Sequence, residues 1–383
     1  MRLLYVIDSL APGGAETSLA EMAPGLVARG VDLHVLPLGR RLDLAHRLEE
    51  GGALVHRREA ASGRFGNVRA VMDEMRAVRP TVVHTTLFEA DVAGRTAARL
   101  RRVPVSTSLV NDSYGASHQA ESNVLKLRAA RQLDASTARF ATRFHAISGA
   151  VADAVAPRLG IPRDTVLVVP RGRDPERFPF QDSEARRNIR AGLGLPPGVP
   201  VVLAVGRLEP QKGLQHLLAA LPRVAAAHPD VVVLIAGKEG RAGAALRATA
   251  AGSGVDIRFL GHRDDVGALL AAADVLCFPS EREGFGGVLI EAMAVGCPVV
   301  ASAIPTTREV LGRGSDCVGL LSEVADPVGL AAAITAVLSD PRDAGLRARR
   351  GRRRFEQHFT VERVVDDMVS FFAEVEGGAD HGT

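Results

Sequence analysis

The feature that most constrains this chain is an alternation of short apolar runs with longer amphipathic segments, which occurs twice. In the first half the apolar runs lie at 2–7, 31–38, 81–86, 103–110 and 144–148. Between them, helical periodicity covers about 15–29, 68–78 and 89–100. Strands and helices that alternate at this length predict a parallel sheet with helices on both faces.

The stretch VVPRGRDPERFPF (168–180) interrupts this alternation, because it holds three prolines and has no regular period. We interpret it as a linker. The alternation then restarts, with apolar runs at 199–206, 231–237, 257–261, 275–280 and 298–302 and helical patterns at 213–227, 241–251, 264–272 and 287–294. The sequence therefore predicts an α/β chain of two doubly wound, Rossmann-like domains, with ligands at the carboxyl ends of the strands in the cleft between them.

Length and composition agree with two folded domains. The chain has 383 residues, beyond the roughly 250–300 at which one core stops growing. The N-terminus lacks the pattern of a secretory signal and no apolar run reaches the ~20 residues of a membrane span, so we expect a cytoplasmic protein. Cys277, Cys297 and Cys317 show no CxxC spacing, which favours buried thiols over disulfides or zinc.

The charge pattern argues against nucleic-acid binding. The net charge is +3, yet basic residues are interspersed with acids and aromatic residues make up 4% of the chain, without tryptophan. One dense basic run, RARRGRRRF (347–355), is interpreted as a solvated helix face. The alternative is a patch that makes peripheral contact with anionic lipid or an anionic acceptor.

A dehydrogenase would share this outline, but its motif is missing. The turn after the first apolar run is DSLAPGGAE instead of G-x-G-x-x-G, and no acidic residue follows the second run.

Two cations follow the first strand of the second domain in GRLEPQKGLQHLL (206–218). Lysine occurs only at positions 126, 212 and 238, so Lys212 stands out among the many arginines. Arg207 and Lys212 at a strand mouth suit a diphosphate, since arginine grips oxygens in bidentate fashion and lysine adds a compact charge. A surface pair bonded to Glu209 is the alternative.

Two carboxylates bracket a glycine-rich turn in SEREGFGGVLIEAMAVGCPVVAS (280–302). Gly286 and Gly287 leave the helix N-terminus bare, so that its amides and dipole can face an anion. Glu283 can accept from sugar hydroxyls and Glu291 from both hydroxyls of a ribose. Dipole compensation and a solvated helix face are the alternatives, but they do not explain the glycines.

These motifs, together with FLGHRDDVGALLAAADVLCFPS (259–280) and the glycine pair at 13 and 14, resemble the retaining GT-B glycosyltransferases of family four. The resemblance covers nearly all of the second domain and, more loosely, the first. It implies that Gly13 and Gly14 approach the donor diphosphate and the acceptor, and that Arg207 and Lys212 bind the diphosphate. It also implies that Glu283 binds the donor sugar, Glu291 the ribose and the loop at His262 and Arg263 the base. Catalysis is assigned to Glu283, Arg207 and Lys212, and the expected donor site also includes Phe285, Gly286 and Gly287.

The chain departs from that family at two places. Many members carry a histidine where this chain has Leu109 and Val110, so acceptor-side contacts are expected from Asn111, Asp112 or His118. Arg171-Gly172 replaces a frequent Asn-Gly, and Arg171 either adds a cation near the diphosphate or pairs with Asp174. His84 and His145 lie on apolar strands and are expected to be structural.

The expected domains are 1–170 together with a returning C-terminal helix at 360–376 for the acceptor, and 171–359 for the donor. The resemblance implies hexosyl transfer with retention. We expect it to be metal-independent, because no Asp-x-Asp pair is present to hold a divalent ion. The co-substrate is a nucleotide diphosphate sugar, UDP in preference to GDP or ADP, with no further cofactor. The sequence leaves the acceptor and the oligomeric state open. A GT-B nucleotide-sugar epimerase and a silent nucleotide-sugar-binding subunit are the alternatives.

Overall fold

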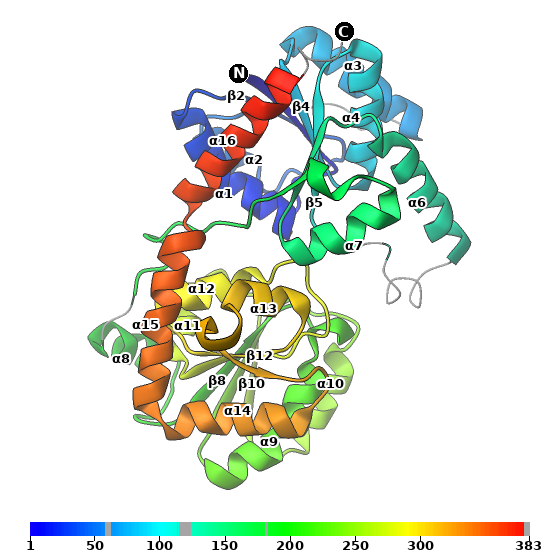
Figure 1. Cartoon of the computed structure of the whole chain (residues 1–383). Coiled ribbons are helices and arrows are strands. Elements are labelled where there is room, and N and C mark those ends of the chain that lie inside the picture. Colours follow the sequence, from blue (N-terminus) through cyan, green and yellow to red (C-terminus); the bar gives the residue numbers. More distant parts are fainter. Residues whose placement is uncertain (58–62, 113, 115–123, 181–182, 379–383) are drawn as a thin grey trace. The chain divides into compact units, whose positions relative to one another are not determined.

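The computed structural model describes all residues except 58–62, 113, 115–123, 181–182 and 379–383. Two compact units divide the chain. The first unit comprises Met1–Gly172 and Val361–Thr383, and the second comprises Arg173–Thr360 (Figure 1). The chain thus crosses between the units within two residues of both predicted boundaries.

The first unit is built on a seven-stranded parallel sheet in the order β3-β2-β1-β4-β5-β6-β7. Its strands are β1 (Arg2–Ile7), β2 (Asp32–Pro37), β3 (Leu54–Val55), β4 (Val82–Thr86), β5 (Val105–Leu109), β6 (Arg143–Ala146) and β7 (Val166–Val168). The order reverses direction between β1 and β4. In sheets of this kind ligands bind at the carboxyl ends of the strands beside such a switch point.

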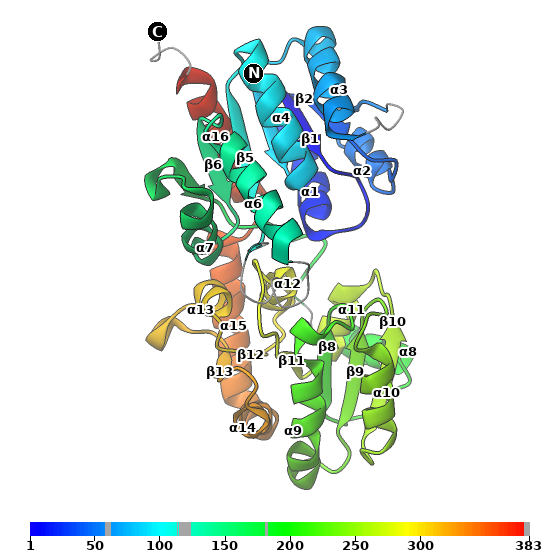
Figure 2. The same cartoon turned by 90° about the vertical axis from the view of Figure 1, so that its right-hand side faces the viewer.

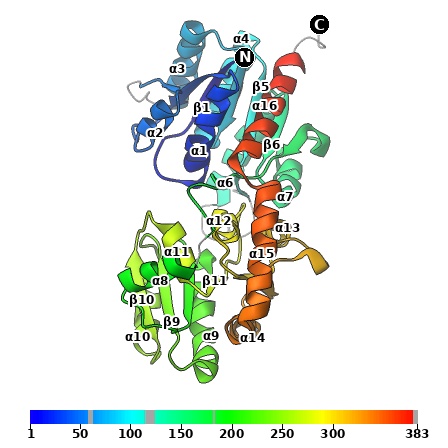
Figure 3. The same ribbon diagram turned by 90° about the vertical axis from the view of Figure 1, so that its left-hand side faces the viewer.

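Helices cover both faces of this sheet. They are α1 (Gly14–Ala28), α2 (Ala45–Glu50), α3 (Gly63–Val78), α4 (Phe88–Arg101), α6 (Val124–Ala138), α7 (Gly149–Leu159) and the C-terminal α16 (Val361–Gly377). Successive residues of β1 point to opposite faces: Tyr5 packs in the core with α1 and α16, and Val6 in the core with α3 and α4. Figure 3 shows α1 and α16 on the same face. The chain's last helix therefore belongs to the first unit, as predicted.

The second unit repeats the plan with six parallel strands in the order β10-β9-β8-β11-β12-β13. The strands are β8 (Val201–Val205), β9 (Val232–Ala236), β10 (Asp256–Gly261), β11 (Val275–Phe278), β12 (Val299–Ser302) and β13 (Leu320–Ser322). Here the order reverses between β8 and β11, which Figure 2 shows side by side.

The helices of the second unit are α8 (Ser183–Gly192), α9 (Leu214–Ala227), α10 (Gly243–Ala251), α11 (Val266–Ala272), α12 (Gly287–Val295), α13 (Pro305–Leu311), α14 (Pro327–Ser339) and α15 (Pro341–His358). α9 and α14 pack against each other over a core of β-branched and leucine side chains. The two-domain, Rossmann-like prediction is confirmed. The sequence patterns predicted no element at α2, β3, α6, α7, β7, α8, α13, β13 or α14, and only the helix face at 347–355 represented α15.

The arginine run at 347–355 lies on α15, and several of its side chains are engaged within the second unit. Arg352 donates to the carbonyl oxygens of Ala294, at 2.6 Å, and of Phe178. Arg354 donates to the carbonyls of Glu309 and Val310. The interpretation as a solvated face therefore holds for exposed members such as Arg349 and Arg353, but not for these two.

Candidate active site

The loop after β8 carries the two predicted cations. Arg207 is exposed two residues beyond the strand, and Lys212 ends a short 3₁₀ turn. Gly213 follows with a φ of 66°, in the left-handed region, and a Cβ there would overlap the carbonyl oxygen of Pro279. Only glycine permits this approach, which brings the loop after β8 against the loop after β11.

Lys212 and Glu283 meet across these two loops. The Lys212 ammonium donates to Oε1 of Glu283, and the two side chains are only 17% and 14% exposed. The hydroxyl of Ser280 donates to the same carboxylate oxygen at 3.0 Å, and the hydroxyl of Thr306 donates to the Glu283 carbonyl at 2.8 Å. The Glu283 carboxylate is therefore fixed beside the switch point between β8 and β11.

The N-terminus of α12 lies next along the chain. Gly286 is its N-cap with a φ of 82°, and no side chain caps the helix there. A Cβ at Gly286 would come within 3.0 Å of Leu289 and 3.1 Å of Phe278, so the position requires glycine. Phe285, expected in the donor site, is 3% exposed and packs edge-on against Phe359. Its ring therefore contributes to the core, and it can reach a ligand through its backbone.

Glu291 projects from the second turn of α12 and is held by Arg173, a residue that the sequence analysis did not select. Nε of Arg173 donates to Oε1 of Glu291 at 2.7 Å, and the side chains are 9% and 13% exposed. A Cβ at Gly287 would lie 2.7 Å from Nη2 of Arg173. The guanidinium therefore occupies the space beside the helix start. A signal for Arg173 was present in the sequence, because in RGRDPERF (171–178) it stands two residues after Arg171, a predicted cation of the linker.

Arg263 follows the end of β10. Its guanidinium pairs with Asp265, with Nε 2.7 Å from Oδ1, and both side chains are partly exposed. The hydrogen bond to Asp265 raises the pKa of Arg263. The pair orders the loop in which the nucleotide base is expected.

The glycine pair of the first unit lies at the start of α1. Gly13 is the N-cap, in extended conformation and without a side-chain cap. A Cβ at Gly14 would overlap the Arg171 guanidinium, so this arginine lies against the helix start within the same unit. Burial raises the pKa of Glu16, one turn further on, and Arg171 offsets part of that shift. Arg171 therefore lies beside the N-terminus of α1, and a role beside the diphosphate stays a prediction.

The three acceptor-side candidates differ in their surroundings. Asn111 is exposed and lines a cavity at the carboxyl ends of β1, β4 and β5. The carboxylate of Asp112 pairs with Arg158 of α7. His118 lies outside the residues that the structure describes.

His84 and His145 are buried between the sheet and α16. His84 bonds to the hydroxyls of Ser106 and Ser108, both at 2.8 Å, and packs against Phe372. His145 bonds to Ser108 and to the carbonyl of Val169. Burial lowers the pKa of His145 to about 4, and it lowers the pKa of His84 well below its ordinary value. Both rings are neutral core members, in agreement with the structural role expected for them.

The described part of the chain contains neither a metal-holding group nor a membrane-spanning helix. There, no group of three or more His, Cys, Asp and Glu side chains has an arrangement that could hold a metal ion. None of the helices described is both long and apolar enough to cross a membrane. Cys277 and Cys297 are buried, and burial raises the pKa of the Cys297 thiol to about 12.

Comparison with known proteins defines the class. A family model described as Glycosyltransferase Family 4 matches residues 12–177, and one described as Glycosyl transferases group 1 matches residues 185–356. Anabaena Alr3699/HepE in complex with UDP-glucose superposes with a TM-score of 0.83 at 25% identity, over 98% of this chain and all of that one. The fold is thus that of the GT-B glycosyltransferases.

Curated relatives place the chain within that class. It is 30% identical to the 2-deoxystreptamine glucosyltransferase of Streptomyces kanamyceticus, over 75% of this chain and 74% of that protein. It is 29% identical to the glycogen synthase of Mycobacterium tuberculosis H37Rv, over 97% and 87% of the two chains. The chain belongs to the group 1, family 4 glycosyltransferases, as the resemblance of its motifs indicated.

Proposed function

We propose that this glycosyltransferase moves a hexose from a nucleotide diphosphate sugar to an acceptor hydroxyl with retention and without a metal ion. The observation that carries the proposal is the group of charges around the second unit's switch point. Lys212 contacts Glu283 there, Arg207 is exposed beside them, and Arg173 holds Glu291 at the bare start of α12. The cations correspond to the diphosphate of a nucleotide sugar, and the two carboxylates correspond to the hydroxyls of its sugar and its ribose.

The cations supply the site for the diphosphate. Lys212 donates to Glu283 through one of its three N–H bonds and has others for a phosphate oxygen. Arg207 can take phosphate oxygens in bidentate fashion, and the α12 amides add partial positive charge. Charge that develops on the departing diphosphate would therefore be stabilised by groups already in position.

The position of Glu283 favours sugar binding over nucleophilic attack. Its Oε1 accepts hydrogen bonds from both Lys212 and Ser280, which lowers its reactivity and fixes its direction. In the proposed step the bond from the anomeric carbon to the diphosphate breaks and the acceptor oxygen bonds to the same face. The acceptor proton passes to an oxygen of the leaving diphosphate.

Glu291 and Arg173 are proposed to bind the ribose, and the loop at Arg263 the base. UDP is the proposed nucleotide, because the Anabaena neighbour was solved with UDP-glucose. The proposed acceptor side lies in the first unit. Gly13 and Gly14 are proposed to approach the diphosphate, and Asn111 the acceptor.

The test is incubation with UDP-glucose, GDP-mannose or ADP-glucose, each with and without excess EDTA, while nucleotide release is measured. We expect release from the UDP-sugar to be fastest and unchanged by EDTA. Loss of activity in EDTA that magnesium or manganese restores would refute metal independence. A changed sugar without nucleotide release would instead indicate an epimerase, and binding without any turnover a silent subunit.

A further inference from the structure

Lys212 and Glu283 lie on two loops that begin beyond the paired part of their strands. Among the described residues, the pairing of β8 with β11 extends over Val202–Leu203 and Val275–Leu276 and ends before either loop begins. At a switch point of this kind a crevice opens outside the carboxyl ends of the strands. A connection between the loops themselves is therefore needed to keep the ammonium of Lys212 beside the carboxylate of Glu283.

Two polar side chains next to this ion pair supply such a connection. Oε1 of Gln211 accepts hydrogen bonds from Nε of Arg282 at 3.1 Å and from Nη2 at 2.8 Å, and both side chains are partly buried. A guanidinium has only donors, so the amide must turn its oxygen toward Arg282. Gln211 directly precedes Lys212. Arg282 directly precedes Glu283 in the other loop, so consecutive residues make the two cross-loop contacts.

The residue before Arg282 adds further hydrogen bonds between the same segments. The backbone N–H of Glu281 donates to the carbonyl oxygen of Gln211 at 3.0 Å. The Glu281 carboxylate lies 2.8 Å from Nε2 of His216 and accepts from Nε2 of Gln215 at 3.1 Å, both in the first turn of α9. The loop after β11 is thereby bonded to the loop after β8 and to the helix that follows it.

Gln211 makes its connection without adding negative charge. A carboxylate at the same position would bond more strongly to Arg282, but it would also repel the diphosphate that Lys212 is proposed to bind. The amide oxygen joins the loops and adds no charge beside the phosphate site. Joined loops matter because contacts to a transition state require groups held to within about 0.5 Å of their productive positions.

We propose that Gln211 and Arg282 are positioning residues of the transfer reaction. Their hydrogen bonds hold Lys212 and Glu283 in the arrangement that the departing diphosphate and the donor sugar require. This inference rests on the proposed function and adds to it the residues that keep its two charged groups in place.

The test is a double-mutant cycle with Gln211→Met and Arg282→Met, which remove the hydrogen bonds and keep unbranched side chains. Each single variant should lower kcat with the fastest of the three nucleotide sugars by at least about 10-fold, because Lys212 and Glu283 lose their fixed positions. The Kd of the matching nucleoside diphosphate should change less than about 3-fold, since both charges remain and their attraction falls off slowly with distance. The double variant should be no slower than the slower single variant, because both changes remove the same contact.

Two further variants and the binding stoichiometry control the cycle. Arg282→Lys keeps a donor for the Gln211 oxygen and should stay within about 3-fold of the wild-type kcat. Arg349→Met makes the same change as Arg282→Met at an exposed arginine of α15 and should match wild type. Calorimetric titration gives the number of nucleotide sites per chain, so a partly unfolded variant is recognised by its low stoichiometry.

A second cycle asks whether Gln211 acts through Lys212. In the Lys212→Ala background, Gln211→Met should lower kcat by less than about 3-fold, because the group that it positions is already absent. A loss in that background as large as in wild type would overturn the inference.

Amide hydrogen exchange reports on the same contacts without turnover. In both single variants the amides of the loop after β11, including that of Glu281, should exchange at least about 10-fold faster than in wild type. Additive losses of kcat, a wild-type kcat in the single variants, or unchanged exchange would each overturn the inference. If wild type releases no nucleotide from any donor, the proposed transfer fails, and exchange still decides whether Gln211 and Arg282 hold the loops together.

Discussion

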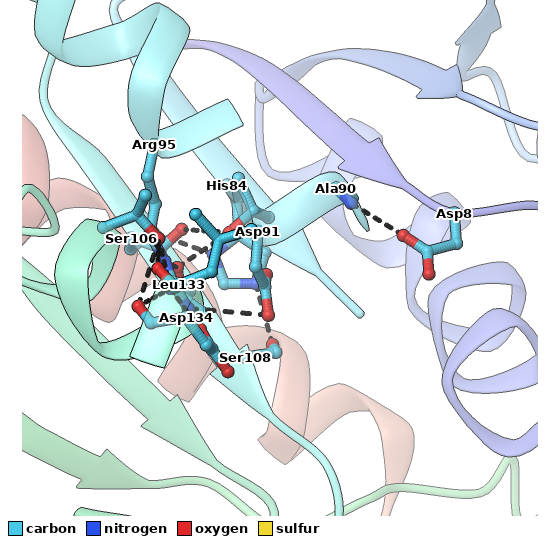
Figure 4. A network of polar contacts seen from close by, with 12 residues as sticks. Asp8, His84, Ala90, Asp91, Arg95, Ser106, Ser108, Leu133 and Asp134 are labelled. Carbon is cyan, nitrogen blue, oxygen red and sulfur yellow. Dashed lines mark hydrogen bonds and ion pairs between the residues drawn. The ribbon is translucent and has the colours of Figure 1, made fainter. Parts of the chain in front are cut away.

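The two sheets of this protein share a plan but place opposite charges at their switch points. In the second unit Lys212 contacts Glu283 and Arg173 holds Glu291, with Arg207 exposed nearby. In the first unit Asp8 and Asp91 line a cavity, and the buried Arg95 pairs with both Asp91 and Asp134 (Figure 4).

The difference indicates what each edge is built to receive. Carboxylates already bonded to cations can position hydroxyl groups while the remaining donors face an anion. The two units therefore differ in the loops after their strands, whereas the plan of the strands is shared.

The largest effect is expected from removal of the buried guanidinium in the first unit. Arg95→Met should destabilise this unit by about 3–5 kcal/mol at pH 8, because Asp91 and Asp134 would remain buried without their cation. Both tyrosines of the chain, Tyr5 and Tyr114, belong to this unit, so tyrosine fluorescence during urea unfolding reports on it. Arg69→Met, at an arginine whose side chain is 86% exposed, is the control. A loss below 1 kcal/mol would mean that the carboxylates need no cation.

The next effect concerns the second unit. Lys212→Ala should lower kcat/KM with the best donor by more than about 30-fold, or ~2 kcal/mol, because a charge-assisted contact to the diphosphate is lost. Arg207→Ala should lower it similarly. Arg223→Ala, at an exposed arginine of α9 in the same domain, is the control and should retain full activity. Wild-type kcat/KM in Lys212→Ala would remove this lysine from the site.

A third prediction uses the buried histidines that only the first unit has. The pKa of His145 is lowered on folding, so the unfolded chain binds the proton more readily and stability is lost as pH falls from about 6.5 toward 4. This amounts to roughly 2 kcal/mol between pH 7 and pH 5. His145→Gln should therefore be less destabilising at pH 5 than at pH 7 by about that amount, again by tyrosine fluorescence. An equal penalty at both values would show that the ring is not held neutral.

The smallest effect is expected at Glu291. A 2′-deoxyribose donor should bind wild type about 1.5 kcal/mol more weakly than the parent donor, because one hydrogen bond to a carboxylate is missing. In Glu291→Gln the difference should be smaller, since that contact is already weakened. Calorimetry with both donors completes the cycle. If both proteins discriminate equally, this carboxylate does not bind the ribose.

Some residues of the candidate site were predictable from the sequence, and others were not. The positions of Arg207, Lys212, Glu283 and Gly286 near strand ends were predictable. Each of these residues follows an apolar run of the regular alternation of strands and helices. Arg173 was not predictable, because its partner Glu291 lies 118 residues away and no local period joins them. Asp91 was not predicted for a related reason. It lies within a helical pattern, and it is buried only because the fold brings Arg95 and Asp134 together beside it.

Some elements also escaped prediction for physical reasons. β3 has two residues and β7 and β13 three each, too few to show a period. The arginines of α15 made its sequence look fully solvated, yet Arg352 and Arg354 donate to carbonyls of neighbouring segments. Hydrophobicity alone cannot report such bonds.

If the proposed site transfers a sugar with retention, the first product carries the donor's anomeric configuration. Proton NMR during reaction of α-linked UDP-glucose, with water or an acceptor that turns over, resolves the anomeric coupling before mutarotation proceeds. We expect an α product, and no covalent adduct on Glu283 in intact-protein mass spectra. A β product from the α donor would contradict retention, and an adduct on Glu283 would contradict the same-face route.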